Sequence, residues 1–300
     1  VQEKNVLIDF GNKELDGNMY LKPLRNLVEH TALYRRQSML LQKSGETSLR
    51  EALQTTAKQI DQDFREAETV DTELADILQT RAVDLARRDR SNLKVSVING
   101  KWRDVNSRGS AGSYQEQTQL INDIKGLIAH VGDTSNLILD PDLDTYYTMS
   151  VTLVRLPEHW TLVSELLDFS LQLAQKEKIS SDEKTRLTVL VGLLQSSTDM
   201  INNEQQRAIK EVDNFSGSKT LNGNVSGPLG NFIRDNREFL SAIQERMIDS
   251  DQIRLTPGDI QATGSRAISS SFSLWDRAIV EMNDMLDTRI SSFQRKKIEV

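Results

Sequence analysis

Cysteine is absent from this chain of 300 residues, and proline, histidine and aromatic residues are scarce. Without cysteine the chain can form no disulfide bond, no thiolate nucleophile and no cysteine-ligated zinc site. Five prolines and 5% aromatic residues, beside abundant leucine, glutamine and arginine, favour long helices over a β-sandwich. The hydrophobic content of 37% and charged content of 27% are typical of a soluble protein with much surface relative to its core.

The chain also lacks a basic face and a long apolar run. Its formal net charge of −7 is spread along the sequence, and aromatic residues do not alternate with lysine and arginine, which argues against nucleic-acid binding. No apolar stretch approaches the roughly 20 residues that span a bilayer, and no signal peptide is recognisable. Because the chain begins at Val1 and ends at Val300 inside a helical pattern, we expect a segment of a longer protein or a processed mature chain.

Apolar residues recur at intervals of three and four along most of the chain, which is the spacing of helices that bury one face. The clearest run consists of Ile268, Phe272, Trp275, Ile279, Met282, Leu286, Ile290 and Phe293. With Asp259 as a cap, this run predicts a helix of about 40 residues, or roughly 60 Å. A helix of this length must run along a bundle.

The same spacing predicts further helices and the breaks between them. The first helix is expected to end near Ser44 and to bend or restart at Pro23, and the second to run from Thr47 to about Arg90. Residues 91–112 are ambiguous, and residues 216–230, rich in glycine, serine and asparagine, are the one obvious loop. Ser180 with Glu183 is the signal of a helix start.

Seven or eight helices with short connections and no strand pattern define the predicted fold. We predict an all-α, elongated antiparallel helical bundle over residues 1–300, with two stacked four-helix-type modules that share long helices as its expected form.

Signatures of catalysis and of cofactor binding are missing from the sequence. His30, His130 and His159 each follow a leucine three positions earlier, so the Glu-x-x-His spacing of a di-iron bundle is absent. His-Glu-x-x-His, a Walker loop and Gly-x-Gly-x-x-Gly are absent too. We therefore predict no enzyme, no cofactor and no metal.

In the segment Asp140-Pro141-Asp142-Leu143-Asp144 every second residue is an aspartate, a pattern that suggests calcium binding. An EF-hand loop needs glycine at its sixth position and glutamate at its twelfth, where this chain has Thr145 and Val151, so that match fails and a calcium site of another geometry stays an alternative. The same segment fits a helix start, with Asp140 as N-cap, Pro141 at the first helical position and acidic residues in the first turn.

Polar residues beside apolar seams are the candidates for a ligand site, since a buried charge needs a partner. The candidate ligand-binding residues are Arg35, Asn136, Asp144, Tyr147 and Arg155. Either arginine could bind a carboxylate or another anion. The alternative is a solvated arginine or a salt bridge to a neighbouring helix.

Four segments carry a resemblance to a known family. They are Ile128–Tyr147, Tyr20–Leu27, Leu156-Pro157-Glu158 and Leu190–Leu194. In type and order they resemble the extracytoplasmic region of bacterial methyl-accepting chemotaxis proteins and related sensor histidine kinases. Thr145-Tyr146-Tyr147 stands where that family commonly has Ser-Tyr-Tyr, and residues 216–300 match only as a generic long helix.

The resemblance implies a periplasmic, all-helical sensor domain tethered by flanking transmembrane helices that lie outside this chain. It further implies a homodimer, a small-molecule or ion ligand, and a small helix displacement that carries the signal across the membrane. The competing hypothesis is a structural or partner-binding helical scaffold, which needs no ligand pocket.

Overall fold

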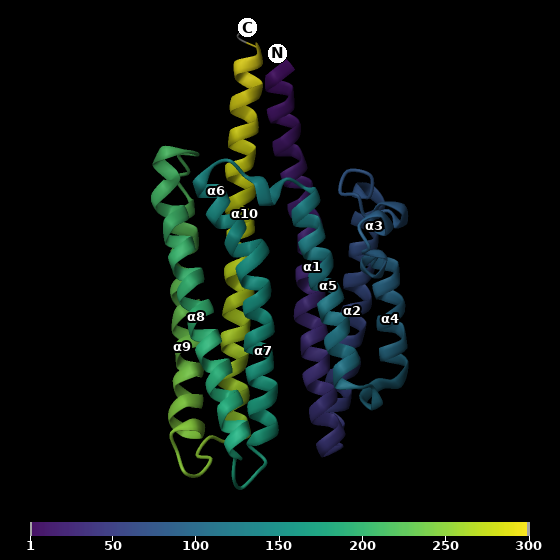
Figure 1. Ribbon diagram of the computed structural model, residues 1–300, viewed down its shortest axis with the longest axis vertical. Helices are drawn as coiled ribbons and strands as arrows, with labels where there is room; N and C mark the ends of the chain where they lie inside the picture. Colours follow the sequence, from purple (N-terminus) through teal and green to yellow (C-terminus); the bar gives the residue numbers. More distant parts are fainter. Residues whose placement is uncertain (1, 299–300) are drawn as a thin grey trace. The chain divides into compact units, whose positions relative to one another are not determined.

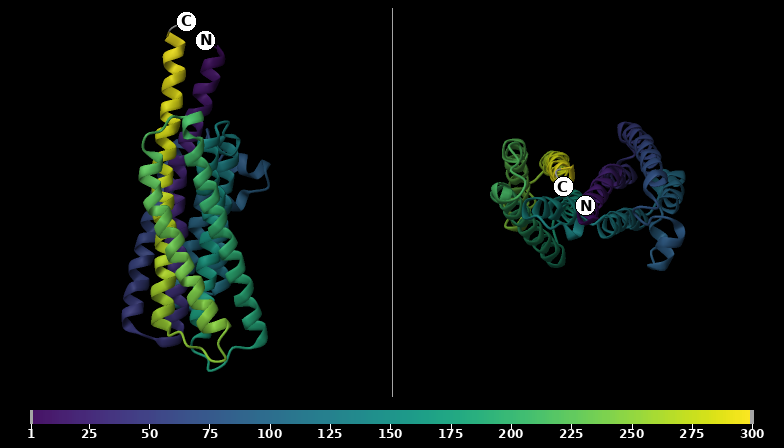
Figure 2. Two further views of the ribbon diagram at one scale, coloured as in Figure 1. Left: turned by 90° about the vertical axis from the view of Figure 1, so that its left-hand side faces the viewer. Right: turned by 90° about the horizontal axis from the view of Figure 1, so that it is seen from above.

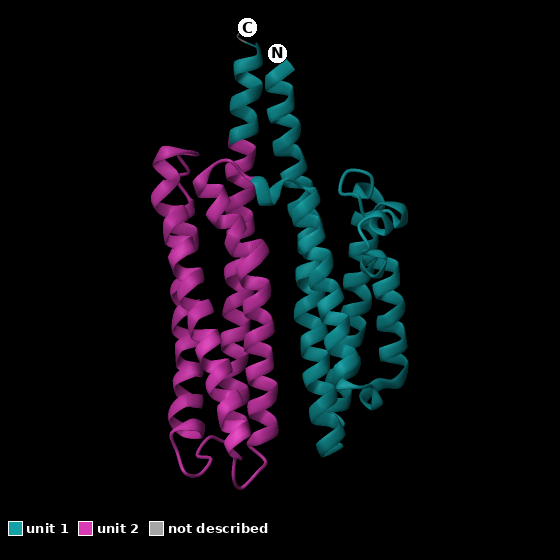
Figure 3. Cartoon of the chain, viewed as in Figure 1, with its two compact units in different colours: residues 1–139, 289–300 teal, residues 140–288 magenta. Residues whose placement is uncertain are grey.

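The computed structural model describes residues 2–298 as helices joined by short connections (Figure 1). No strand occurs among these residues, and the predicted all-α bundle class is confirmed. The chain divides into two compact units (Figure 3): unit 1 comprises residues 1–139 and 289–300, and unit 2 comprises residues 140–288. Within the described residues, no helix combines the length and the apolar character that crossing a membrane requires.

Unit 1 is built around the first helix. Its elements are α1 (Gln2–Ser44), α2 (Thr47–Leu74), α3 (Ala82–Arg87), η1 (Ser91–Leu93), α4 (Val95–Arg108), η2 (Gly109–Ala111), α5 (Tyr114–Thr134), η3 (Leu137–Leu139) and the last turns of α10 (Pro257–Ile298). α1 packs against α2 and α5. It ends at Ser44 as predicted, and Pro23 lies inside it without interrupting it.

The second helix is shorter than predicted, because it ends at Leu74 and not near Arg90. The chain turns there so that Thr80 can donate a hydrogen bond to Asp71 at 2.6 Å, and Leu78 becomes fully buried. Gln79 takes a left-handed backbone conformation in this turn, with φ of 52°. The turn therefore adds a donor to a buried carboxylate, whose desolvation is costly without hydrogen bonds.

The first turns of α1 and the last turns of α10 lie side by side in unit 1 (Figures 1 and 2). Gly11 permits this approach, because a Cβ atom there would lie 2.7 Å from the side chain of Ile290. Glu14, which is fully buried, forms an ion pair with Arg289. The pairing of α1 with the end of α10 therefore combines close backbone approach with a buried charge pair.

Unit 2 contains the remaining elements. They are α6 (Leu143–Met149), η4 (Ser150–Arg155), α7 (Leu156–Leu173), α8 (Ser181–Glu211), η5 (Val212–Asn214), α9 (Leu221–Ile243), η6 (Gln244–Ile248) and residues 257–288 of α10. The η4 and η6 segments are π-helical. Trp275 joins α10 to η4 by donating from Nε1 to the Thr152 carbonyl at 2.9 Å. The predicted start of α8 is confirmed, with Ser180 and Glu183 forming a capping box.

The predicted loop over residues 216–230 is wrong from Leu221 onwards, because α9 begins there. Leu221, Val225 and Leu229 recur every four residues and are all buried. The glycines between them face open space, where a side chain would meet nothing within 4 Å. Burial of one apolar face thus maintains a helix despite its glycine content.

The predicted helix start at Asp140 is also displaced, because α6 begins at Leu143 with Asp142 at its N-cap position. Asp140 accepts hydrogen bonds from the Asp142 backbone at 2.9 Å and from the Thr145 hydroxyl at 2.6 Å. Asp140 therefore holds the turn that precedes the helix.

Replacing Arg289 by methionine should lower the free energy of unfolding by about 3 kcal/mol, because it removes the guanidinium that pairs with the buried Glu14 carboxylate. Urea denaturation followed by circular dichroism measures the change. The matched control is Arg266→Met, which removes a pair with Glu238 in which both side chains are about half exposed and should cost less than about 1 kcal/mol. Equal effects of the two substitutions would contradict a special role for the buried pair.

His159 should make unfolding dependent on pH. The imidazole is fully buried between Ser197 at 3.0 Å and Asn236 at 2.9 Å, and burial lowers its pKa to about 4. In the unfolded chain the histidine has a pKa of 6.5, so below this pH it binds a proton that the buried imidazole does not bind. The free energy of unfolding should therefore fall as the pH drops from about 6.5 towards 4. The full loss is about 3 kcal/mol.

Denaturant titrations of the wild type and of His159→Gln across this pH range test the prediction. The difference in unfolding free energy between the two proteins should be constant above pH 6.5 and should shrink below it. A difference that stays constant down to pH 4 would show that His159 is not the group responsible.

Candidate functional site

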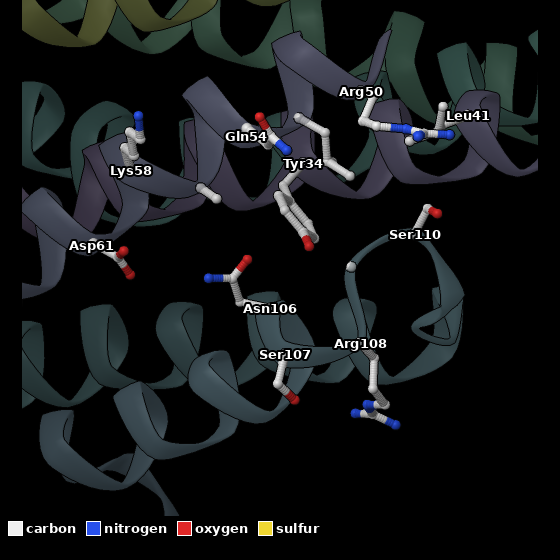
Figure 4. Close-up of a pocket in the computed structure, with 13 residues that line it drawn as sticks. Tyr34, Leu41, Arg50, Gln54, Lys58, Asp61, Asn106, Ser107, Arg108 and Ser110 are labelled. Atoms are coloured by element: carbon white, nitrogen blue, oxygen red, sulfur yellow. The ribbon is translucent and has the colours of Figure 1, made fainter. Parts of the chain in front are cut away.

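A cavity of unit 1 lies between α1, α2 and the end of α4, and its volume is about 590 Å³. That volume falls in the range of small-molecule sites. Figure 4 shows the residues that line it, which are Tyr34, Leu41, Arg50, Leu53, Gln54, Ala57, Lys58, Asp61, Asn106, Ser107, Arg108, Gly109 and Ser110.

Tyr34 reaches from α1 into this cavity (Figure 4). Its ring is almost fully buried and packs edge-on against Trp102, with 4.8 Å between ring centroids and 86° between planes. Within residues 2–298 its hydroxyl has no hydrogen-bond partner. Burial raises the pKa of this phenol, so it stays a neutral donor. An unsatisfied buried hydroxyl lowers the stability of the folded state by about 1–3 kcal/mol. A ligand that accepts a hydrogen bond from it would recover this free energy.

Two amide side chains share the cavity with Tyr34. Asn106 comes from α4 and lies between Tyr34 and Asp61 in Figure 4, and Gln54 comes from α2 above the Tyr34 ring. Asp61 accepts a hydrogen bond from Trp102 Nε1 at 2.7 Å. The Trp102 ring, and through it the Tyr34 ring, is therefore held in place from α2.

Basic side chains surround the mouth of the cavity. Arg108 pairs with Glu116 at 2.8 Å. Arg50 and Lys58 are exposed, and neither forms an ion pair within the part of the chain that the structure describes. In Figure 4 the charged ends of Lys58 and Arg108 turn away from the Tyr34 hydroxyl, so these cations lie around the rim and not on the floor.

Two of the five predicted ligand-binding residues belong to unit 1. Arg35 follows Tyr34 but does not line the cavity; it is buried, donates to Thr118 at 2.9 Å and lies over the Tyr114 ring at 4.5 Å. Asn136 connects α5 to η3 in a left-handed conformation, with φ of 70°. Neither Arg35 nor Asn136 therefore lines the unit 1 cavity.

The other three predicted residues belong to unit 2. Asp144 is fully buried and accepts from the backbone of Ser216 at 3.0 Å, and its burial raises the carboxyl pKa. Arg155 pairs with Glu204 at 2.9 Å, and Tyr147 lies below the Arg207 guanidinium at 5.7 Å. A ligand site made of the five residues stays a prediction.

The acidic segment beside α6 offers no metal site among the described residues, since no group of three His, Asp or Glu side chains converges there or elsewhere in residues 2–298. A second hollow of about 250 Å³ lies in unit 2 beside α9 and α10. Its arginines are already engaged, Arg234 with Asp235 at 3.0 Å and Arg266 with Glu238 at 2.9 Å. The unit 1 cavity is therefore the stronger candidate.

Most of the cavity residues were not predicted from the sequence. Tyr34 lies within the predicted first helix, and Asn106 lies in the ambiguous segment 91–112. Arg50, Gln54 and Lys58 lie on the polar face of α2, which gives no local signal of a site. Comparisons of the chain with protein-family models, curated proteins and solved structures find no match.

Replacing Tyr34 by phenylalanine should leave the unfolding free energy unchanged or raise it slightly, because the lost hydroxyl has no partner in the folded protein. Tyr20→Phe is the matched control on the same helix. Tyr20 is equally buried, but its hydroxyl donates to Asp71 at 2.9 Å, so its removal should cost about 1–3 kcal/mol. If Tyr34→Phe destabilises the protein as much as Tyr20→Phe does, the Tyr34 hydroxyl has a structural partner.

Proposed function

We propose that this chain is the extracytoplasmic ligand-sensing domain of a transmembrane chemoreceptor or sensor histidine kinase. In this proposal the unit 1 cavity receives a small molecule and α1 passes a small displacement towards the membrane. The observation that carries the proposal is the unpartnered Tyr34 hydroxyl, which is buried at the edge of a 590 Å³ cavity. The resemblance of Ile128–Tyr147 to chemoreceptor sequences supports the type of receptor.

The position of the cavity on α1 supports the signalling part of the proposal. Tyr34 and Leu41 line the cavity, and Glu14 on the same continuous helix pairs with Arg289 of α10. Some 20 residues of helix, or about 30 Å, separate the two places. A rigid helix transmits a small shift over this distance without absorbing it, so ligand contact at Tyr34 can alter the pairing of α1 with α10.

A scaffold without a small-molecule ligand is the competing function. A scaffold has no use for a buried donor beside an empty space, because every such group lowers stability. A homodimer, which the chemoreceptor resemblance implies, is part of the proposal and gives each receptor two copies of the cavity.

A thermal-shift screen of the full 300-residue chain against amino acids, organic acids, amines, sugars and inorganic ions tests the proposed function. A specific ligand at a hundred times its dissociation constant should stabilise the folded state by about 2.7 kcal/mol. The shift should be greatly reduced in Tyr34→Phe and retained in Tyr20→Phe. If no compound raises the melting temperature, the sensing proposal fails and the scaffold is favoured. A shift that is the same in Tyr34→Phe would contradict binding in the unit 1 cavity.

A further inference from the structure

The charge around the unit 1 cavity is unbalanced. Three basic side chains, Arg50, Lys58 and Arg108, and a single acidic one, Asp61, line it. Arg108 pairs with Glu116, whereas the Asp61 carboxylate, which accepts from the neutral Trp102 indole, keeps its negative charge. Arg50 and Lys58, two turns apart on α2, form no ion pair within the described chain, so the charge around the cavity stays positive on balance. Such a field attracts anions and repels amines.

The interior of the cavity presents hydrogen-bond donors. The Tyr34 phenol is neutral and has its hydrogen free to donate. The Asn106 amide beside it carries an NH2 donor as well as a carbonyl acceptor, and its oxygen is the atom nearer to Tyr34 in Figure 4. A donor bonded to a charged oxygen contributes roughly twice what it contributes to a neutral one. The ligand group that would form the strongest hydrogen bond with the Tyr34 hydroxyl is therefore a negatively charged oxygen.

The cavity is lined by apolar side chains between the Tyr34 hydroxyl and the basic residues at its mouth. Leu41, Leu53 and Ala57 line the cavity together with the Tyr34 ring, and all four residues are buried. An inorganic anion would fill little of a 590 Å³ space and would leave these carbon surfaces without contact. An organic skeleton that carries the anionic group can cover them and gain from their burial.

We propose that the unit 1 cavity binds a small organic carboxylate, whose carboxylate group accepts a hydrogen bond from Tyr34 while Arg50 and Lys58 supply the compensating charge. This inference rests on the proposed sensing function and adds the chemical class of the ligand. Asn106 completes the polar floor, and Leu53 and Ala57 contact the hydrocarbon part.

Calorimetric titration and thermal shift with matched series of compounds test the ligand class. The probes are straight-chain, hydroxylated and aromatic carboxylates of two to eight carbons, the primary amide and the amine of each skeleton, and sulfate, nitrate and phosphate. We expect at least one carboxylate to bind, its uncharged amide to bind at least tenfold more weakly, and its amine not to bind. Raising the ionic strength should weaken carboxylate binding.

Variants identify the residues that recognise the carboxylate. Tyr34→Phe should weaken binding about tenfold or more, the size of loss expected for a hydrogen bond to a charged group. The double variant Arg50→Gln, Lys58→Gln removes two exposed charges at the mouth, so it should weaken binding at low ionic strength and have less effect as salt is added. The double variant changes only exposed side chains, so its melting temperature without ligand should not change. Arg65→Gln, an exposed position on the same helix outside the cavity, is the control and should bind as the wild type does.

The outcomes separate this inference from the function on which it rests. Binding of an amine, a neutral compound or only an inorganic ion, lost in Tyr34→Phe, would overturn the carboxylate class and keep the sensing function. Carboxylate binding that is unchanged in both Tyr34→Phe and the double variant would overturn the assigned site. The absence of binding by every probe would overturn the carboxylate class. Only the absence of a shift with amino acids, sugars and other inorganic ions as well would overturn the sensing proposal.

Discussion

The burial of polar side chains on α1 is the constraint on which unit 1 depends. Each such group must find a partner, because desolvation without a hydrogen bond costs several kcal/mol. Glu14 pairs with Arg289 of α10, Tyr20 donates to Asp71 of α2, and Arg35 donates to Thr118 of α5. The partners come from three different helices, so together they fix the rotation and the register of α1. Apolar contacts, which have no direction, could not do this alone.

The Tyr34 hydroxyl departs from this rule, and it does so beside a cavity, which is why we propose a ligand site there. Helical spacing indicates that Tyr34 points inward. It cannot predict whether the hydroxyl finds a hydrogen-bond partner, because that depends on the positions of Gln54 and Asn106, which are distant in sequence. The neighbouring Arg35 was a candidate for its charge, yet its long side chain finds Thr118 and the Tyr114 ring. A phenol at the end of a ring fixed against Trp102 cannot move to find a partner. Departures from local rules gather at functional sites.

Sequence patterns predicted the helices whose signals are local. The run from Ile268 to Phe293 and the Ser180 cap gave α10 and the start of α8 within two residues. The errors arose where a distant contact decides. α2 ends early, at a turn in which Thr80 donates to Asp71. Residues 221–230 are helical because their apolar face is buried although glycines lie on the other face.

The same partners that fix α1 limit how it can move. A slide by one turn, about 5.4 Å, would break its pairs with Arg289, Asp71 and Thr118 together and leave several buried polar groups unsatisfied. A shift of a fraction of an ångström keeps each donor within hydrogen-bond reach and costs far less. The Tyr34 hydroxyl has no bond to lose, so a ligand there adds an interaction to α1 without removing one. Occupation of the cavity should therefore reach α10 as a small adjustment at the Glu14–Arg289 pair, with the helix register unchanged.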